Sequence, residues 1–200
     1  MIKVEHVETW GFEHAIRGMR NPKNSWDRSD SDSSQIGEND LHLMQSLFKA
    51  GSEHRKYLRQ IMVSMDITAP LYWWKEFDTY KVGTVADSCS TMHKIHAKEF
   101  TAEDFSFEHL NFASMGLLEK TISMLNFYRT QFLETKDKLY WWQMIQLLPT
   151  SYNQKRTVTL NYEVAYRITE QRSHHKLDEW HDFCEILQKN LPFFTEIIKK

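Results

Sequence analysis

The sequence predicts an α+β protein in which helices predominate around a small sheet. The 200 residues contain only six glycines and four prolines, so long helices and few tight hairpins are expected. Apolar residues recur at helical spacing through residues 109–134, but they alternate as in a strand along residues 58–68. The length and a hydrophobic fraction of 41% predict a single domain, residues 1–200, with a packed core.

The first elements are a strand, a short helix and a polar loop. Ile2, Val4 and Val7 predict a strand over residues 2–9, and Phe12–Met19 suits a short helix. Residues 21–37 are polar and rich in turn formers, so we expect a mobile loop there. That loop is either a surface insertion or a segment that closes over a ligand.

The next elements are a helix and a strand. Residues 40–50 carry one apolar helical face, with Asn39 as the expected cap and Gly51 as the expected stop. Residues 58–68 form a strand with its alternate apolar residues on one side. Pro70 then fits the first turn of an aromatic helix.

The middle of the chain is expected to contain a loop followed by helices. Residues 82–90 are polar and suit a loop, and residues 92–98 could be helical. Thr101 resembles a helix start, with Asp104 in the place of the usual capping Glu. A long amphipathic helix is expected over residues 109–134.

The C-terminal third contains the most regular pattern. A helix ends at Leu148-Pro149, and the chain returns to a strand before three more helices. The expected elements are a helix at 137–148, a turn at 150–154, a strand at 157–160, helices at 162–172 and 175–190, and a short helix after Pro192.

Composition excludes several classes of protein. A formal net charge of −2 argues against a dedicated nucleic-acid binder. Two cysteines cannot build a disulfide framework, so a reducing cytoplasm is the expected compartment. Neither a membrane-spanning apolar run nor a signal peptide is apparent, so we expect no membrane partner.

A group of polar residues follows Leu148-Pro149. Lys155 and Arg156 form a basic pair, Asn161 precedes a helix, and Arg172 comes near the end of that helix. Taken singly, the basic pair is a solvated surface feature, Asn161 is a helix cap, and Arg172 is a helix-end ion pair. A phosphate dianion would nevertheless use such cations.

The order and spacing of these residues resemble the C-terminal half of the flavin-dependent thymidylate synthases. The resemblance extends to about residues 51–93, where Ala69-Pro70 leads into an aromatic helix. The family signature there is Arg-His-Arg, and this chain has Thr79-Tyr80-Lys81 instead. Glu163 also replaces a family Arg, so the chain looks like a divergent member.

The resemblance implies an enzyme that binds deoxyuridine monophosphate and methylates C5 of the pyrimidine, or modifies it in a related way. Arg172 would be the catalytic residue, because an arginine polarises a carbonyl as the ring is attacked. Glu76 stands in place of a family Gln that contacts the nucleotide. The implied substrate-binding residues are Glu76, Asp87, Ser90, Lys155, Arg156 and Arg172.

The resemblance also implies FAD as cofactor, with NADPH and methylenetetrahydrofolate as co-substrates. The implied cofactor-binding residues are His54, Lys81, Asn161, Arg167 and Lys176. The family assembles as a homotetramer, and the same is implied here. An alternative is a non-catalytic nucleotide-binding or regulatory protein derived from the family, because the signature and the charge at Glu163 have changed.

Other residues suit other chemistry less well. His93 with His96, and the cluster His174, His175 and His181, could draw a metal, but surface histidines are the simpler interpretation and no metal site is predicted. Cys89 is either a nucleophile or an ordinary thiol. The pairs Trp73-Trp74 and Trp141-Trp142 could stack on a flavin or base, although packing in the core or at an interface is the commoner use.

Overall fold

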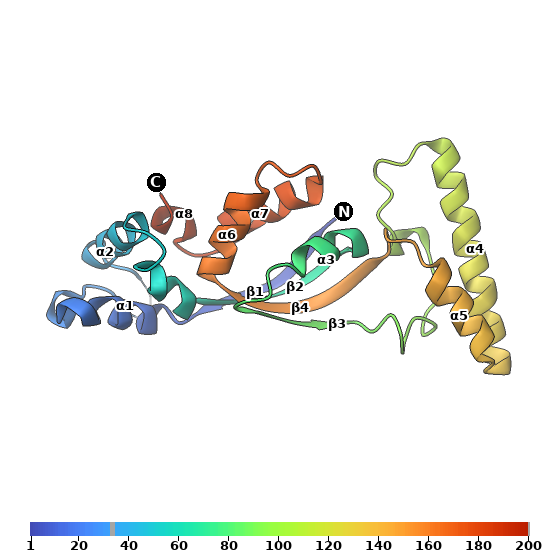
Figure 1. The fold of residues 1–200 in the computed structure, drawn as a ribbon, viewed down its shortest axis with the longest axis horizontal. Coiled ribbons are helices and arrows are strands. Elements are labelled where there is room, and N and C mark those ends of the chain that lie inside the picture. The colour runs from blue at the N-terminus through green and yellow to red at the C-terminus, as the bar shows by residue number, and fades with distance from the viewer. Residues whose placement is uncertain (33–34, 200) are drawn as a thin grey trace. The chain divides into compact units, whose positions relative to one another are not determined.

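The structure is a computed structural model that describes residues 1–32 and 35–199. It confirms the α+β class, because helices predominate around one small antiparallel sheet (Figure 1). The sheet has the strand order β1-β2-β4-β3. Its strands are β1 (Lys3–Trp10), β2 (Met62–Pro70), β3 (Thr84–Ser88) and β4 (Asn153–Asn161).

Helices occur along the whole chain and range from one turn to more than six. The α-helices are α1 (Phe12–Arg20), α2 (Glu38–Lys49), α3 (Leu71–Phe77), α4 (Phe112–Thr135), α5 (Lys138–Leu147), α6 (Tyr162–Arg172), α7 (Asp178–Asn190) and α8 (Phe194–Ile197). The 3₁₀ helices are η1 (Asn21–Lys23), η2 (Trp26–Arg28), η3 (Arg55–Gln60) and η4 (Ala102–Asp104). No helix among the described residues combines the length and apolar content needed to cross a membrane.

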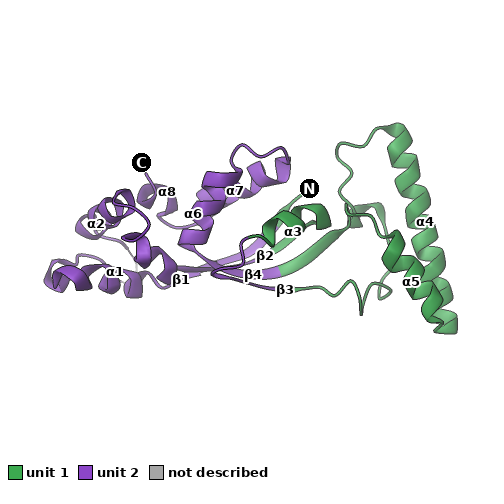
Figure 2. Cartoon of the chain, viewed as in Figure 1, with its two compact units in different colours: residues 1–3, 67–79, 87–156 green, residues 4–66, 80–86, 157–200 purple. Residues whose placement is uncertain are grey.

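The chain divides into two compact units, which Figure 2 shows in different colours. Unit 1 comprises residues 1–3, 67–79 and 87–156, and unit 2 comprises residues 4–66, 80–86 and 157–200. All four strands contribute residues to both units.

Unit 1 is built on the pair of helices α4 and α5, which pack against each other. Its core cluster consists of Ile95, Phe100, Phe105, Leu118, Leu125 and Met144. Asp137 caps α5, as its side chain accepts from Leu139 N. The helix expected at 137–148 is confirmed, and so is the long helix expected at 109–134.

Unit 2 packs α6 against α7 and α2 against α8. Aromatic side chains fill much of its interior, and Tyr162 meets Phe194 edge to face with ring centroids 5.3 Å apart. Asn161 caps α6 by accepting from Val164 N at 3.0 Å. The two C-terminal helices and the short helix after Pro192 are therefore confirmed.

The predicted apolar side of the strand at 58–68 is confirmed, because Val63, Met65 and Ile67 are all buried. The strand itself begins later, at Met62, since η3 occupies the preceding residues. Gly51 follows α2 with φ of +114°, so it does stop that helix. Asn39 is not the cap, because α2 begins at Glu38.

Three predictions for the middle of the chain were wrong in part. Residues 84–88 form strand β3 and not a loop, and they were missed because an exposed edge strand has no apolar alternation. Residues 92–98 form turns without a helix. Thr101 and Asp104 do make a capping box, but it encloses only the 3₁₀ turn η4.

The polar segment 21–37 contains two 3₁₀ turns, η1 and η2. Its residues 33–34 lie outside the described residues. Asp40, the third residue of α2, accepts hydrogen bonds from Ser29 Oγ at 2.8 Å and from Ser31 Oγ at 2.7 Å. These bonds hold Ser29 and Ser31 against α2. The mobility of residues 21–37 stays a prediction.

Candidate functional site

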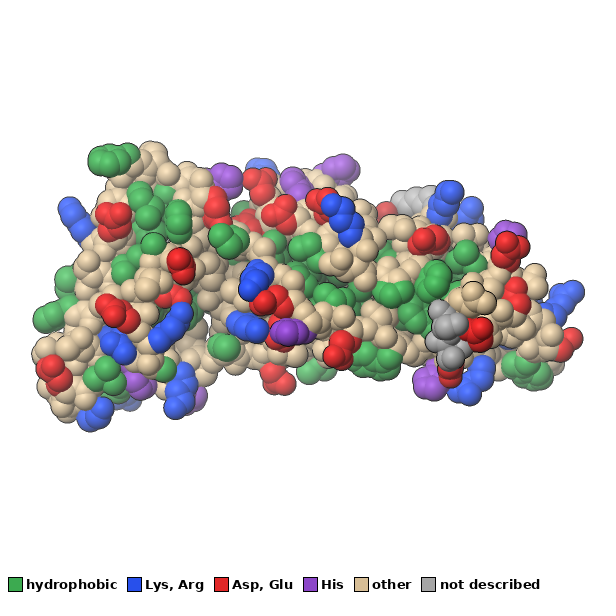
Figure 3. All heavy atoms as spheres, turned by 180° about the vertical axis from the view of Figure 1, so that it is seen from behind, with side chains coloured by type: hydrophobic (Ala, Val, Ile, Leu, Met, Phe, Trp, Pro, Cys, Tyr) green, Lys and Arg blue, Asp and Glu red, His purple; other side chains and the backbone are tan. Residues whose placement is uncertain are grey.

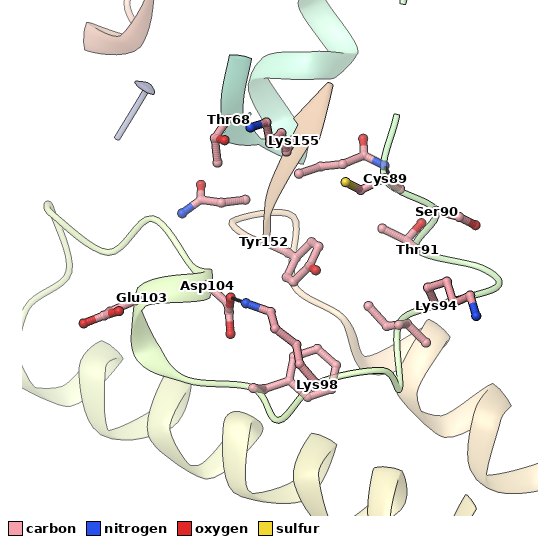
Figure 4. Close-up of a pocket in the computed structure, with 14 residues that line it drawn as sticks. Thr68, Cys89, Ser90, Thr91, Lys94, Lys98, Glu103, Asp104, Tyr152 and Lys155 are labelled. Carbon is pink, nitrogen blue, oxygen red and sulfur yellow. Dashed lines mark hydrogen bonds and ion pairs between the residues drawn. The ribbon is translucent and has the colours of Figure 1, made fainter. Parts of the chain in front are cut away.

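Unit 1 contains a cavity of about 450 Å³ next to the start of β4 (Figure 4). A volume of this size is within the range of small-molecule sites, roughly 300–1,000 Å³. The lining includes Ser90 and Lys155, two residues that the sequence assigned to a phosphate. The remaining lining residues are Thr68, Cys89, Thr91, Lys94, Ile95, Lys98, Phe100, Glu103, Asp104, Tyr152, Asn153 and Gln154.

Two hydrogen bonds hold the segment after β3 against β4. Cys89 N donates to Lys155 O at 2.9 Å, and Gln154 Nε2 donates to Cys89 O at 2.8 Å. Both polar groups of the Cys89 backbone are therefore satisfied by β4. This pairing explains why Ser90 and Lys155 line the same cavity although they are far apart in the sequence.

The irregular segment from 92 to 100 is fixed by side chains of α4 and α5. Trp141 Nε1 donates to Met92 O at 2.9 Å, and Arg129 Nε donates to His96 O at 3.0 Å. Asn126 bonds both backbone groups of Phe100, each at 2.8 Å. A segment without regular structure is thus supplied with hydrogen-bond partners by the helices beside it.

Ser90 and Lys94 belong to one turn. Ser90 Oγ accepts from His93 N at 2.9 Å, and Ser90 O accepts from Lys94 N at 3.2 Å. Because the hydroxyl oxygen is the acceptor, its hydrogen remains able to donate to a ligand oxygen. The turn also places Lys94 on the lining, next to the hydroxyl of Thr91.

The charges on the lining have both signs. Lys98 forms an ion pair with Asp104, which also accepts from Thr101 N at 2.9 Å (Figure 4). The pair neutralises one lysine, and the lining also contains Lys94, Lys155 and the exposed Glu103. An anion with several oxygens would be held by these two amines and the neighbouring hydroxyls.

Tyr152 brings a phenol to the same cavity. Burial raises the pKa of Tyr152 above its ordinary value of 10, and the negative charge of Asp104 raises it further. The hydroxyl therefore stays protonated at neutral pH and can donate. Its ring packs edge to face on Phe105 with centroids 5.7 Å apart, so its position is fixed by the core.

Arg156 does not line the cavity. Its Nη1 donates to Asp78 Oδ1 at 2.7 Å, its Nε donates to Gln154 Oε1 at 3.0 Å, and its guanidinium lies 4.2 Å from the Trp74 ring centroid. Gln154 in turn bonds the backbone of Cys89. Arg156 therefore supports the lining indirectly, by holding the side chain of Gln154.

The other two substrate candidates of unit 1 also lie off the lining. Glu76 is half-buried on α3, and its backbone oxygen accepts from Thr79 Oγ1 at 2.8 Å. Asp87 is exposed on β3. The cavity therefore brings together Ser90 and Lys155, but not Glu76, Asp87 or Arg156.

Arg172, the predicted catalytic residue, belongs to unit 2 and lies in the last turn of α6. Its Nε donates to Tyr80 Oη at 3.0 Å. The guanidinium lies 4.9 Å from the ring centroid of Trp180 and 5.6 Å from that of Tyr80. The aromatic rings fix the plane of this half-buried cation.

The cofactor candidates all belong to unit 2. Asn161 is buried and caps α6, whereas the other four side chains are exposed: His54, Lys81, Arg167 and Lys176. Within the described residues, no ion pair involves Lys81, Arg167 or Lys176. Three cations of one unit thus remain available to the phosphates of a dinucleotide.

Glu163 is compensated inside the protein. This buried carboxylate pairs with Arg55, whose Nη2 lies 3.3 Å from Glu163 Oε1. Arg55 itself lies over the rings of Phe48 and Tyr166, 5.1 Å and 4.9 Å from their centroids. This acid therefore has a cationic partner of its own.

Sequence reasoning missed several lining residues, among them Lys94, Lys98 and Tyr152. The i, i+4 spacing of the two lysines was a usable signal, but the segment was assigned to an unremarkable helix. Tyr80 was also missed as a partner of Arg172. It was considered only as the residue that replaces the His of the basic triplet.

The tryptophan, cysteine and histidine candidates for other chemistry show no arrangement that indicates a separate ligand site in the described residues. Trp73 and Trp74 are buried in the core, which supports packing over stacking on a ligand. Cys89 is exposed and Cys184 is buried, and both are free thiols. No group of three or more His, Cys, Asp or Glu side chains in the described residues is arranged to hold a metal ion.

The fold is that of the flavin-dependent thymidylate synthases known as ThyX. A crystal structure of ThyX from Helicobacter pylori, complexed with FAD and dUMP, matches with a TM-score of 0.74 and 16% identity, over 98% of this chain and 97% of that one. A second structure of the Helicobacter pylori enzyme with FAD and dUMP gives a TM-score of 0.73 and 16% identity, with 100% of both chains covered. No protein-family model and no curated protein matches the sequence.

Proposed function

We propose that the protein binds a pyrimidine nucleoside monophosphate, deoxyuridine monophosphate in the first instance, and methylates C5 of its base with a flavin. The single observation that carries the proposal is the cavity of unit 1 that joins Ser90 to Lys155. Both residues were assigned to a phosphate from the sequence. Two similar folds are known with dUMP bound, which supports the choice of nucleotide.

The lining suits the phosphate part of such a nucleotide. Lys94 and Lys155 supply charge, Ser90 and Thr91 supply hydroxyls, and Tyr152 supplies a protonated phenol. Hydrogen bonds to a phosphate dianion from charged donors are about twice as strong as neutral ones. In this proposal Arg156 acts by holding Gln154. The resemblance further assigns Glu76 and Asp87 to nucleotide binding and Arg172 to catalysis, as the residue that would polarise a carbonyl.

The test is calorimetric titration of dUMP into the protein and into Lys155→Ala. Loss of a charged hydrogen bond is expected to weaken binding by about 2 kcal/mol, or roughly 30-fold. Lys75→Ala is the matched control, because Lys75 is an exposed lysine of α3 in the same unit. Equal affinity in Lys155→Ala and the parent would remove Lys155 from the site.

The donor set of unit 2 fits the anionic part of FAD. Lys81, Arg167 and Lys176 are cations without an ion pair in the described chain, and a dinucleotide carries a pyrophosphate that such cations bind. His54 and Asn161 are the remaining implied contacts. When bound, the flavin would carry hydride from NADPH to a carbon unit supplied by methylenetetrahydrofolate.

In that reaction, residues of this chain would bind the nucleotide and orient the groups that act on its base. Arg172 has a fixed guanidinium, since Tyr80 accepts from its Nε and two rings cover it. A fixed cation needs little reorganisation when negative charge develops on a carbonyl oxygen. Removing it is expected to slow the reaction as well as to weaken nucleotide binding.

Flavin affinity is expected to be retained but weak. The basic triplet of the family is reduced to Lys81, while Arg167 and Lys176 restore charge in the same unit. Flavin fluorescence titrated with protein measures this, with Arg167→Glu as the test variant. Binding as tight as a prosthetic group that Arg167→Glu leaves unchanged would contradict the assigned compensation.

The second candidate function is nucleotide binding without methyl transfer. It is favoured by the replacement of the basic triplet by Thr79-Tyr80-Lys81. The two functions separate in one experiment, in which tritium release from C5-labelled dUMP is measured with FAD, NADPH and methylenetetrahydrofolate present. Saturable dUMP binding without any release, and no flavin binding at millimolar concentration, would favour the second.

We also propose a homotetramer in a reducing compartment such as the cytoplasm. Helix α4 carries large apolar side chains that unit 1 leaves exposed, including Phe112 at 96% and Leu117 at 66%. Both cysteines are free thiols, which suits a reducing compartment. Light scattering at tens of micromolar protein should give four times the chain mass, and a monomer there would exclude the assembly.

A further inference from the structure

Unit 2 contains a second cavity of about 450 Å³, between the end of α1 and the start of α2. It is lined by Arg20, Lys23, Ser25, Arg28, Asn39 and Leu43, so it shares no lining residue with the cavity of unit 1. Three of the six are cations and none is an acid. We propose that this cavity binds a diphosphate group, either inorganic or carried by a nucleoside.

Arg20 is a pre-organised donor at this cavity. It is only 4% exposed, and its Nε donates to Asp40 Oδ1 at 2.6 Å. Its Nη1 donates to Ser25 O at 3.0 Å, which fixes the guanidinium from a second direction. Within the described residues nothing accepts from Nη2, so that edge of the fork can meet a ligand oxygen.

Asp40 offsets the charge of Arg20, so Lys23 and Arg28 carry the net positive charge of the cavity. Its Oδ2 accepts from Ser29 Oγ, Ser31 Oγ and the backbone N–H groups of Asp30 and Ser31. The carboxylate is completely buried and therefore has no access to a ligand. These hydrogen bonds and the ion pair hold Arg20 and the backbone of 29–31 in place.

Lys23 and Arg28 complete the cation set. They lie at the ends of η1 and η2, and both are exposed. No described acid forms an ion pair with either one. Lys23 and Arg28 line one cavity without a described acidic partner, and an anion of high charge relieves the repulsion between them. A diphosphate has more charge and more oxygens than a single phosphate, so it can contact both cations and also accept from Arg20 Nη2.

The lining also indicates which part of a ligand the cavity can bind. Leu43 is its one apolar residue, which is too little apolar surface to bury a base. The cavity therefore recognises the charged group and leaves the rest of the ligand outside. Figure 3 shows acidic and basic side chains interspersed over one face of the protein, so that face has no general positive charge that would attract anions everywhere.

The test is calorimetric titration with inorganic pyrophosphate and, separately, with ADP. The test variant is the double replacement of Lys23→Ser and Arg28→Ser, which leaves the buried Arg20–Asp40 pair intact. Loss of two charged contacts is expected to weaken pyrophosphate binding about 100-fold. The control is Lys49→Ser, since Lys49 is an exposed lysine of α2 outside the cavity, and its affinity should stay within about twofold of the parent.

Saturable pyrophosphate binding that the double variant loses and Lys49→Ser keeps supports the site. Tighter binding of ADP than of pyrophosphate would then identify a nucleotide as the carrier. No saturable binding at millimolar pyrophosphate would overturn the proposal, and so would equal weakening by Lys49→Ser. Binding of oligothymidylate that pyrophosphate fails to displace would assign the surface to nucleic acid instead.

Discussion

Arg172 Nε donates a hydrogen bond to Tyr80 Oη at 3.0 Å, and Tyr80 donates onward to Gln171 Oε1 at 3.0 Å. Tyr80 is buried, so it offers this cation a fixed partner. Tyr80 thus orients the predicted catalytic arginine through a hydrogen bond and an aromatic face.

Replacing Arg172 or Tyr80 tests this relationship. Arg172→Ala should weaken dUMP binding by about 2 kcal/mol through a lost charged hydrogen bond. Tyr80→Phe keeps the ring and loses the hydroxyl, so it should weaken binding by a smaller amount, about 1 kcal/mol. Calorimetry measures both, with Arg59→Ala as an exposed control in unit 2. A Tyr80→Phe protein that binds like the parent would show that the hydroxyl does not orient Arg172.

Gly83 should not tolerate a side chain. Its φ is +81°, and a Cβ there would lie 2.7 Å from Asn161 Nδ2, the side chain that caps α6. Gly83→Ala is expected to lower the free energy of unfolding by about 2 kcal/mol, combining left-handed strain with a disturbed cap. Gly116→Ala is the control, because Gly116 lies in α4 with open space around it and should gain about 1 kcal/mol. Urea unfolding distinguishes the two, and similar effects would contradict the contact with Asn161.

Asp40 should make stability depend on acid pH. Burial acts to raise the pKa of Asp40, but hydrogen bonds from Ser31, Ser29 and Arg20 outweigh it, so the pKa lies below its ordinary value of 3.8. The contribution is complete above pH 3.8 and is lost as the pH falls through the folded-state pKa. Asp40→Asn should cost about 3 kcal/mol at pH 7 by leaving Arg20 unpaired.

The cost of Asp40→Asn should shrink when urea unfolding is repeated at a pH well below 3.8, because the parent protein is then protonated too. Asp27→Asn serves as the control, since Asp27 is an exposed acid of the neighbouring turn η2. A cost that is the same at both pH values would contradict the role of the Asp40 charge.

The two cysteines should differ in reactivity. Burial raises the pKa of Cys184 to about 11, although Arg172 partly opposes the shift, so its thiol is neutral and shielded at pH 8. Cys89 is exposed in the cavity lining. Ellman's reagent should therefore titrate one thiol in the native protein and two in urea, and Cys89→Ser should abolish the native signal. Two thiols reacting at once in the native state would show that unit 2 opens readily around α7.

Elements with strong periodicity or a clear cap could be predicted from the sequence. Asn161 caps a helix where it was expected, and the alternate apolar residues of β2 are buried. Strand β3 was not predictable in the same way, because it is an exposed edge whose partner β4 lies far along the chain. The residue pattern within β3 alone does not indicate that it pairs with β4.

The candidate site shows the same division. Ser90 and Lys155 were implied by the resemblance to a known family, and the structure places both on one cavity. Arg156 was assigned with them, yet its neighbours Asp78 and Trp74 come from a different segment and draw it away from the lining. Spacing along the chain carries no information about these neighbours, so the separation of Arg156 from Lys155 could not be predicted.

The side chains of Asn126, Arg129 and Trp141 bond the backbone of the segment that carries Lys94 and Lys98, and none of the three lines the cavity. The shape of the pocket is therefore encoded at helix positions that a ligand never reaches. A saturation-mutagenesis screen for altered ligand preference would find variants there, on α4 and α5, and a library restricted to lining residues would miss them. Homologues that keep every lining residue but change these three side chains should differ in what they bind.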